Sequence, residues 1–127
     1  LVQLHPKAPQ EAVATECAEE LGGNEAFWAY TGRIFDVTPS NNGLDLALLP
    51  SLAEEVGLDR TAFQECLESG RHRDTVQADL EDAERAGGTG TPYSVLVART
   101  GQRIPINGAQ PYEKVKVVID SLLQGSQ

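Results

Sequence analysis

Apolar residues recur at helical spacing along the first third of the chain. Over residues 8–22 they lie three or four positions apart, and a Gly-Gly pair closes the segment, a pattern that predicts a helix. Asn24 is then placed to cap a second helix over residues 25–37. We expect its five large apolar side chains to dominate the local core. They are Phe27, Trp28, Tyr30, Ile34 and Phe35.

Turn residues separate shorter apolar segments in the middle of the chain. Residues 38–43 are rich in Pro, Ser, Asn and Gly, which predicts a loop. Proline suits a first helical turn, so we expect the next regular helix to begin near Pro50 and to end at Gly57. Asp59 is expected to cap the helix after that, which ends before Gly70.

The periodicity changes from helical to extended in the last third. Residues from about 71 to 86 form a polar helical pattern with a narrow apolar stripe. Residues 93–98 and 102–106 flank a Gly-containing turn, which is typical of a β-hairpin. Pro105 marks the second strand as a sheet edge, and Pro111 begins a last helix. With a short strand over Leu1–Leu4, the order favours helices inserted into an α/β frame.

Composition and charge exclude several classes of function. The chain has 127 residues, enough for one domain, and 40% of them are hydrophobic. Ten basic and nineteen acidic residues give a net charge of −9, which argues against binding nucleic acid or an anionic membrane. No apolar run approaches the roughly 20 residues of a membrane helix. No signal peptide is visible and no Met is present, so we expect a mature or truncated product.

Two cysteines, Cys17 and Cys66, belong to neither a Cys-x-x-Cys pair nor a zinc-ligand cluster. Both lie on apolar faces, which suits either two inert buried thiols or a structural disulfide, and an extracytoplasmic compartment would favour the disulfide. We expect His5 and His72 to lie far from both cysteines, and we interpret His72 as a surface residue. We therefore expect no metal site and no cofactor.

Gly90-Thr91-Pro92-Tyr93 joins a Gly-rich break to an apolar β-branched run. Proline at the mouth of a strand cannot donate to the ladder, and an X-Pro bond takes the cis form at modest cost. The pattern suggests a backbone held beside a strand where an extended partner could pair. An ordinary loop leading into a strand, with a trans bond, is the alternative.

Together these motifs resemble the DsbA-like branch of the thioredoxin superfamily over nearly the whole chain. Gly90-Thr91-Pro92-Tyr93 is similar to that family's cis-proline loop, and the hairpin and last helix resemble the carboxy-terminal half of a thioredoxin fold. The helical part of this chain resembles the family's inserted helical domain. The motifs that carry this resemblance are His5-Pro6, Glu16-Cys17-Ala18, Phe27-Trp28-x-Tyr30 with Ile34-Phe35, Leu52-Ala53 with Gly57-Leu58-Asp59, and Phe63-x-x-Cys66-Leu67.

The resemblance implies an α/β, thioredoxin-like but incomplete fold with an inserted α-helical domain. Residues 1–7 would supply a strand of the thioredoxin-like domain, residues 8–88 the helical insertion, and residues 89–127 the cis-proline loop, hairpin and helix. The family's redox Cys-x-x-Cys is missing from this chain, and we expect it upstream of Leu1. The missing part would be cleaved but associated, supplied by another chain, or absent.

The resemblance also implies a function. Pro92 would be cis, and Gly90, Thr91 and Pro92 would dock an extended segment of a thiol- or disulfide-containing protein outside the cytoplasm. The chain would then be part of a thiol–disulfide oxidoreductase. The chain itself would contain no catalytic residue. A non-catalytic module that binds a peptide or partner is the alternative. A glutathione-transferase-like protein fits less well, because here the helices precede the proline loop.

Overall fold

The computed structural model describes residues 5–124, so the predicted strand over Leu1–Leu4 lies outside the described part. The chain divides into two compact units, Leu1–Leu80 and Glu81–Gln127. The structure is mostly helical and includes one small two-stranded sheet. Within residues 5–124, no helix combines the length and apolar character needed to cross a membrane.

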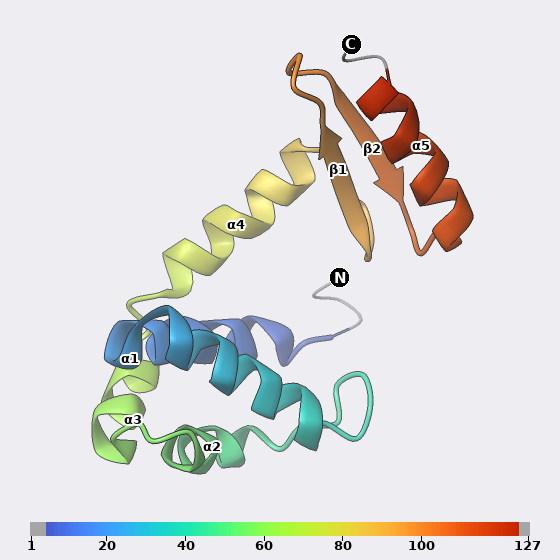
Figure 1. Cartoon of the computed structure of the whole chain (residues 1–127). Coiled ribbons are helices and arrows are strands. Elements are labelled where there is room, and N and C mark those ends of the chain that lie inside the picture. The colour runs from blue at the N-terminus through green and yellow to red at the C-terminus, as the bar shows by residue number, and fades with distance from the viewer. Residues whose placement is uncertain (1–4, 125–127) are drawn as a thin grey trace. The chain divides into compact units, whose positions relative to one another are not determined.

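Helix α1 (Ala8–Val37) is broken at Gly23, so that it consists of two arms that run in different directions (Figure 1). Gly23 has φ 72° and ψ −170°, a conformation open to glycine and strained for other residues. Gly22 leaves no room for a larger side chain, because a Cβ atom there would lie 2.5 Å from Ala26 Cβ and 2.8 Å from Leu58 Cδ2. The predicted end of the first helix at the Gly-Gly pair is therefore confirmed.

Two expectations for the second arm of α1 are wrong. The Asn24 side chain makes no capping bond and instead accepts a hydrogen bond from the Trp28 indole at 3.1 Å. Trp28 and Phe35 are 64% and 76% exposed, so neither belongs to the core. Only one stripe of a helix can face the core, and Tyr30 and Ile34 occupy it here.

The predicted turn and cap residues define the elements that follow. Pro50 lies in the first turn of its helix, as expected. The Asp59 carboxylate accepts a hydrogen bond from Ala62 N at 2.7 Å, and Gly70 ends the same helix at φ 62°. The elements are η1 (Leu46–Leu48), α2 (Leu49–Glu55), α3 (Arg60–Ser69) and α4 (Arg73–Arg85).

Tyr30 lies at the centre of the core of the first unit and is fully buried. Its hydroxyl donates to the Leu49 carbonyl at 2.9 Å, and its ring centroid lies 5.0 Å from that of Phe63. Burial, and then the negative charge of Glu11, raise the pKa of Tyr30, so the hydroxyl keeps its donor proton. The buried cluster around it comprises Val13, Ala14, Cys17, Ala18, Ile34, Leu44, Leu49, Leu52, Ala53, Phe63 and Cys66.

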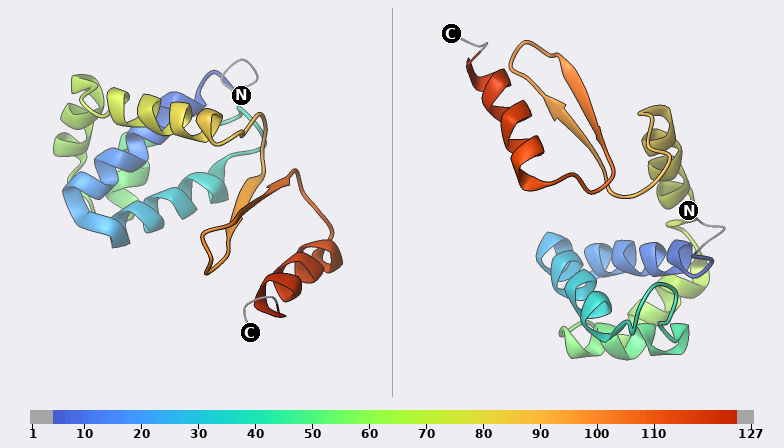
Figure 2. Two further views of the ribbon diagram at one scale, coloured as in Figure 1. Left: turned by 90° about the horizontal axis from the view of Figure 1, so that it is seen from above. Right: turned by 90° about the vertical axis from the view of Figure 1, so that its right-hand side faces the viewer.

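The second unit contains the predicted hairpin and last helix (Figure 2). Strands β1 (Tyr93–Val97) and β2 (Arg103–Asn107) pair antiparallel, with Tyr93 opposite Asn107 and Pro105 opposite Val95. Helix α5 (Tyr112–Gln124) follows. No side chain between residues 81 and 124 is buried. Large apolar side chains are exposed on the hairpin and on α5, including Val97, Val117 and Leu123.

Tyr30→Phe tests the buried hydrogen bond. The variant keeps the ring and removes the donor to Leu49 O, so the free energy of unfolding in urea should fall by about 1 kcal/mol. Tyr112→Phe is the matched control, because Tyr112 is 72% exposed, and it should change little. Equal effects of the two substitutions would contradict this role of Tyr30.

Candidate functional site

The loop that precedes β1 is largely exposed to solvent. Thr91 and Pro92 are exposed, Gly90 is half-buried, and the Thr91–Pro92 peptide bond is cis. The Pro92 carbonyl accepts a hydrogen bond from Gly108 N at 2.9 Å. Within residues 5–124, neither the N–H nor the C=O of Thr91 makes a hydrogen bond. Both groups are therefore available to an extended segment, while the docking role of the loop stays a prediction.

Contacts within the second unit hold both ends of this loop. On one side, the Tyr93 hydroxyl donates to the Ala86 carbonyl at the end of α4, and Gly88 N donates to Ala83 O at 2.9 Å. On the other side, the bond from Gly108 to Pro92 extends the hairpin ladder by one step beyond the Tyr93–Asn107 pair. The exposed Thr91 thus lies between two fixed points, a geometry suited to adding a strand.

Cys17 of α1 and Cys66 of α3 form a disulfide. The structural disulfide, one of the two alternatives left open by the sequence, is the one found. Both residues are fully buried, and their Cα atoms lie 5.9 Å apart. Since the chain has only these two cysteines, it contains no free thiol.

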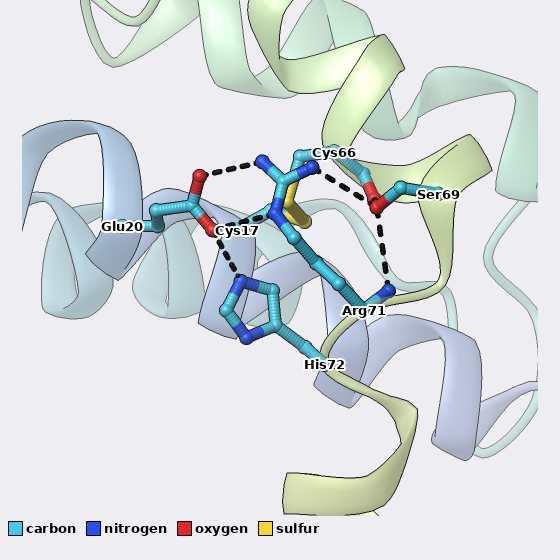
Figure 3. A network of polar contacts seen from close by, with 6 residues as sticks. All are labelled: Cys17, Glu20, Cys66, Ser69, Arg71 and His72. Atoms are coloured by element: carbon cyan, nitrogen blue, oxygen red, sulfur yellow. Dashed lines mark hydrogen bonds and ion pairs between the residues drawn. A yellow bond between two sulfur atoms is a disulfide. The ribbon is translucent and has the colours of Figure 1, made fainter.

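A cluster of charged side chains lies next to the disulfide (Figure 3). The Arg71 guanidinium donates to the two carboxylate oxygens of Glu20 at 2.8 and 2.5 Å, and its Nη1 donates to Ser69 Oγ at 3.0 Å. The His72 ring nitrogen Nε2 lies 2.7 Å from Glu20 Oε2. The cluster links the first arm of α1 to the turn between α3 and α4.

The expectation that His72 lies far from both cysteines is wrong. Its side chain is 20% exposed and is held against Glu20. One of its ring nitrogens and the sulfurs of Cys17 and Cys66 all lie within 4.8 Å of one another, so it is not far from the cysteines. The sulfurs are bonded to each other and offer no thiolate to a metal. The contact between Glu20 and Arg71 could not be predicted from neighbouring residues, because the two residues are 51 positions apart in the sequence.

Electrostatics in this cluster act mainly on Glu20. Hydrogen bonds from Arg71 and then His72 lower the pKa of Glu20 from 4.5 to about 2. The same hydrogen bond to Glu20 raises the pKa of Arg71. The Glu20 carboxylate therefore stays ionised well below the pH at which a free glutamate takes up a proton.

Glu20→Gln should destabilise the protein in a pH-dependent way. A folded-state pKa below the ordinary value means that the carboxylate stabilises the fold fully above pH 4.5, and that this contribution is lost as pH falls toward 2. In urea unfolding, the free energy of unfolding of the variant should fall furthest below that of the parent near neutral pH. The difference should shrink as the pH falls from 4.5 toward 2. Glu19→Gln, an exposed neighbour, is the control. A deficit that does not vary with pH, or that Glu19→Gln reproduces, would refute the assignment.

One family model matches the chain, that of the DSBA-like thioredoxin domain, over residues 22–120. The matched region includes most of the helical segment, the Gly90-Thr91-Pro92 loop, the hairpin and most of α5. Neither the curated proteins nor the solved structures gave a significant match. Because the model spans well over half of the sequence, the chain belongs to the family of DSBA-like thioredoxin domains.

Proposed function

We propose that this chain is the larger part of a thiol–disulfide oxidoreductase that acts on the cysteines of other proteins outside the cytoplasm. The observation that carries the proposal is the family match over residues 22–120, because it covers the helical segment and the candidate docking loop together. In this proposal the chain supplies the substrate-docking surface, and the redox cysteine pair lies outside these 127 residues.

The docking step uses the backbone of Thr91. Thr91 is an exposed residue whose N–H and C=O are unpaired within residues 5–124, so an extended substrate segment can pair with them as an added strand. Main-chain pairing is tolerant of side-chain identity, which suits an enzyme that receives many different proteins. Gly90 and Pro92 flank the pairing residue and shape the loop.

The redox step requires cysteines that this chain does not offer. In the family, a thiolate of the Cys-x-x-Cys pair forms a mixed disulfide with one substrate sulfur, and the second cysteine resolves it. Two electrons pass between the cysteine pair and the substrate. When the substrate disulfide forms, the disulfide of the pair is reduced, and when the substrate disulfide is broken, the pair is oxidised. Cys17 and Cys66 do not fit this role, because both are fully buried and bonded to each other.

The proposed architecture is an incomplete thioredoxin-like fold interrupted by a helical insertion over residues 8–88. The exposed apolar side chains of the second unit support it, among them Val97, Val117 and Leu123. An α/β layer of this kind needs further strands and helices to cover its faces. The missing amino-terminal part, whether from the same gene or another chain, would supply that cover.

A second candidate is a non-catalytic module that holds a peptide or partner by the same loop. The burial of both cysteines in a structural bridge favours it. The coding sequence upstream of Leu1 separates the two candidates. A Cys-x-x-Cys some tens of codons upstream supports the enzyme, whereas an unrelated domain or a start codon supports the module.

The purified 127-residue chain should neither reduce insulin nor oxidise a dithiol peptide above the buffer rate, because it has no accessible thiol or disulfide. Cys17→Ser combined with Cys66→Ser should be equally inactive. Substantial turnover that survives both substitutions would contradict the assignment of the redox centre to a separate segment.

An unstructured peptide should nevertheless bind to the loop. With acetyl-Ala-Val-Ser-Val-Ala-amide as the probe, the backbone amide signals of Gly90, Thr91 and Tyr93 should shift in a saturable way. The same peptide N-methylated at its central residue should bind roughly tenfold more weakly, because it lacks the paired N–H. Equal binding of the two peptides, or shifts that spare this loop, would exclude docking by strand addition.

A further inference from the structure

A cavity of about 430 Å³ lies in the first unit, and neither cysteine of the disulfide lines it. Its walls come from both arms of α1 and from the loop that follows it, including Glu11, Thr31, Ile34, Phe35 and Asn41. The break at Gly23 brings these walls together, because it turns the second arm so that Thr31 faces the same space as Glu11. The volume falls within the range of small-ligand pockets.

Two oxygens in these walls are buried without a hydrogen-bond partner. They are Glu11 Oε1 and Thr31 Oγ1, and they are the only such side-chain atoms found among the described residues. The hydroxyls of two other threonines of the cavity are satisfied by the helix itself, since Thr15 donates to Ala12 O and Thr38 to Ile34 O. Native proteins rarely leave buried polar atoms unpaired, so these two oxygens are positioned to accept hydrogen bonds from a molecule in the cavity.

The charge of Glu11 is also uncompensated. Lys7 lies one helical turn earlier, where it could pair with Glu11, but its ammonium donates to the Leu44 carbonyl instead. Across residues 5–124 no lysine, arginine or histidine forms an ion pair with Glu11. A carboxylate is an acceptor only, so its natural partner is a cation that carries N–H donors.

The remaining walls suit the stem of such a cation. Ile34 and Ala12 supply aliphatic surface, and Phe35 projects an aromatic ring that is 76% exposed. Aliphatic stems of basic side chains pack on apolar surface while the charged head stays with polar partners. An aromatic ring at the wall can also attract a cation, and a net charge of −9 raises the local concentration of cations.

We propose that this cavity binds an alkylammonium or alkylguanidinium group, with the cationic head on Glu11 Oε1 and Thr31 Oγ1 and the stem between Ala12, Ile34 and Phe35. The group is carried by a lysine or arginine side chain of a polypeptide, or by a free small amine. The site is independent of the thiol chemistry proposed above, and nothing in that chemistry requires it.

The test is a titration of the full chain followed by amide chemical shifts, with n-butylammonium and acetyl-Gly-Lys-Gly-amide as probes and n-butanol as the neutral control. Both cations should give saturable shifts at Thr15, Thr31 and Thr38, and n-butanol should bind at least roughly tenfold more weakly. Tighter binding of the peptide than of the free amine assigns the site to polypeptides, and equal binding assigns it to small amines.

Glu11→Gln should weaken binding of n-butylammonium at least roughly tenfold, whereas Glu19→Gln on the same arm of α1 should leave it unchanged. Thr31→Val provides a second variant that preserves shape and keeps the test decisive if Glu11→Gln does not fold. The proposal is overturned if neither cation gives saturable shifts, if n-butanol binds as tightly as the cations, or if the variants bind as the parent does.

Discussion

The covalent bond between Cys17 and Cys66 is the constraint on which the helical unit depends. It joins α1 to α3 across 49 positions of sequence, and closing a loop of that length disfavours the unfolded chain by about 4 kcal/mol in the entropy model. The core around Tyr30 and Phe63 packs against the joined helices. The pair of Glu20 and Arg71 then fixes the turn that leads from α3 into α4.

The same disulfide also bears on function. Because it uses every cysteine of the chain, we propose a docking role for this chain and place the redox pair outside these 127 residues. The two units differ in their burial. The first has its own buried core, whereas the described residues of the second have none and leave the backbone of Thr91 unpaired. In the proposed function, recognition is therefore separated from electron transfer.

Local signals predicted the element boundaries well, because each depends on a few neighbouring residues. Asp59 caps α3, Gly70 ends it, Pro50 lies in a first turn, and the hairpin follows the switch to extended periodicity. The DsbA-like resemblance was likewise readable from motif order. The division of a thioredoxin-like domain by residues 8–88 stays a prediction, although the two compact units separate near Leu80.

Features that depend on which helix faces meet could not be read from the sequence. Trp28 and Phe35 were expected in the core, but only the tertiary packing of α1 decides that Tyr30 and Ile34 face inward. The contact of His72 with Glu20, and the cavity between the arms of α1, arise from segments brought together by the break at Gly23 and by the disulfide.

The central claim is that the bridge of this chain is structural and that the redox pair lies elsewhere. The most direct measurement is the intact mass of the protein isolated from its source, alkylated with and without prior reduction. We expect two alkyl groups gained by Cys17 and Cys66, and two more gained by a further cysteine pair, either in a chain heavier than the 13.6 kDa of these 127 residues or in a second chain that copurifies with it. If Cys17 and Cys66 are the only cysteines alkylated after reduction, in this chain and in every chain that copurifies with it, the account is contradicted.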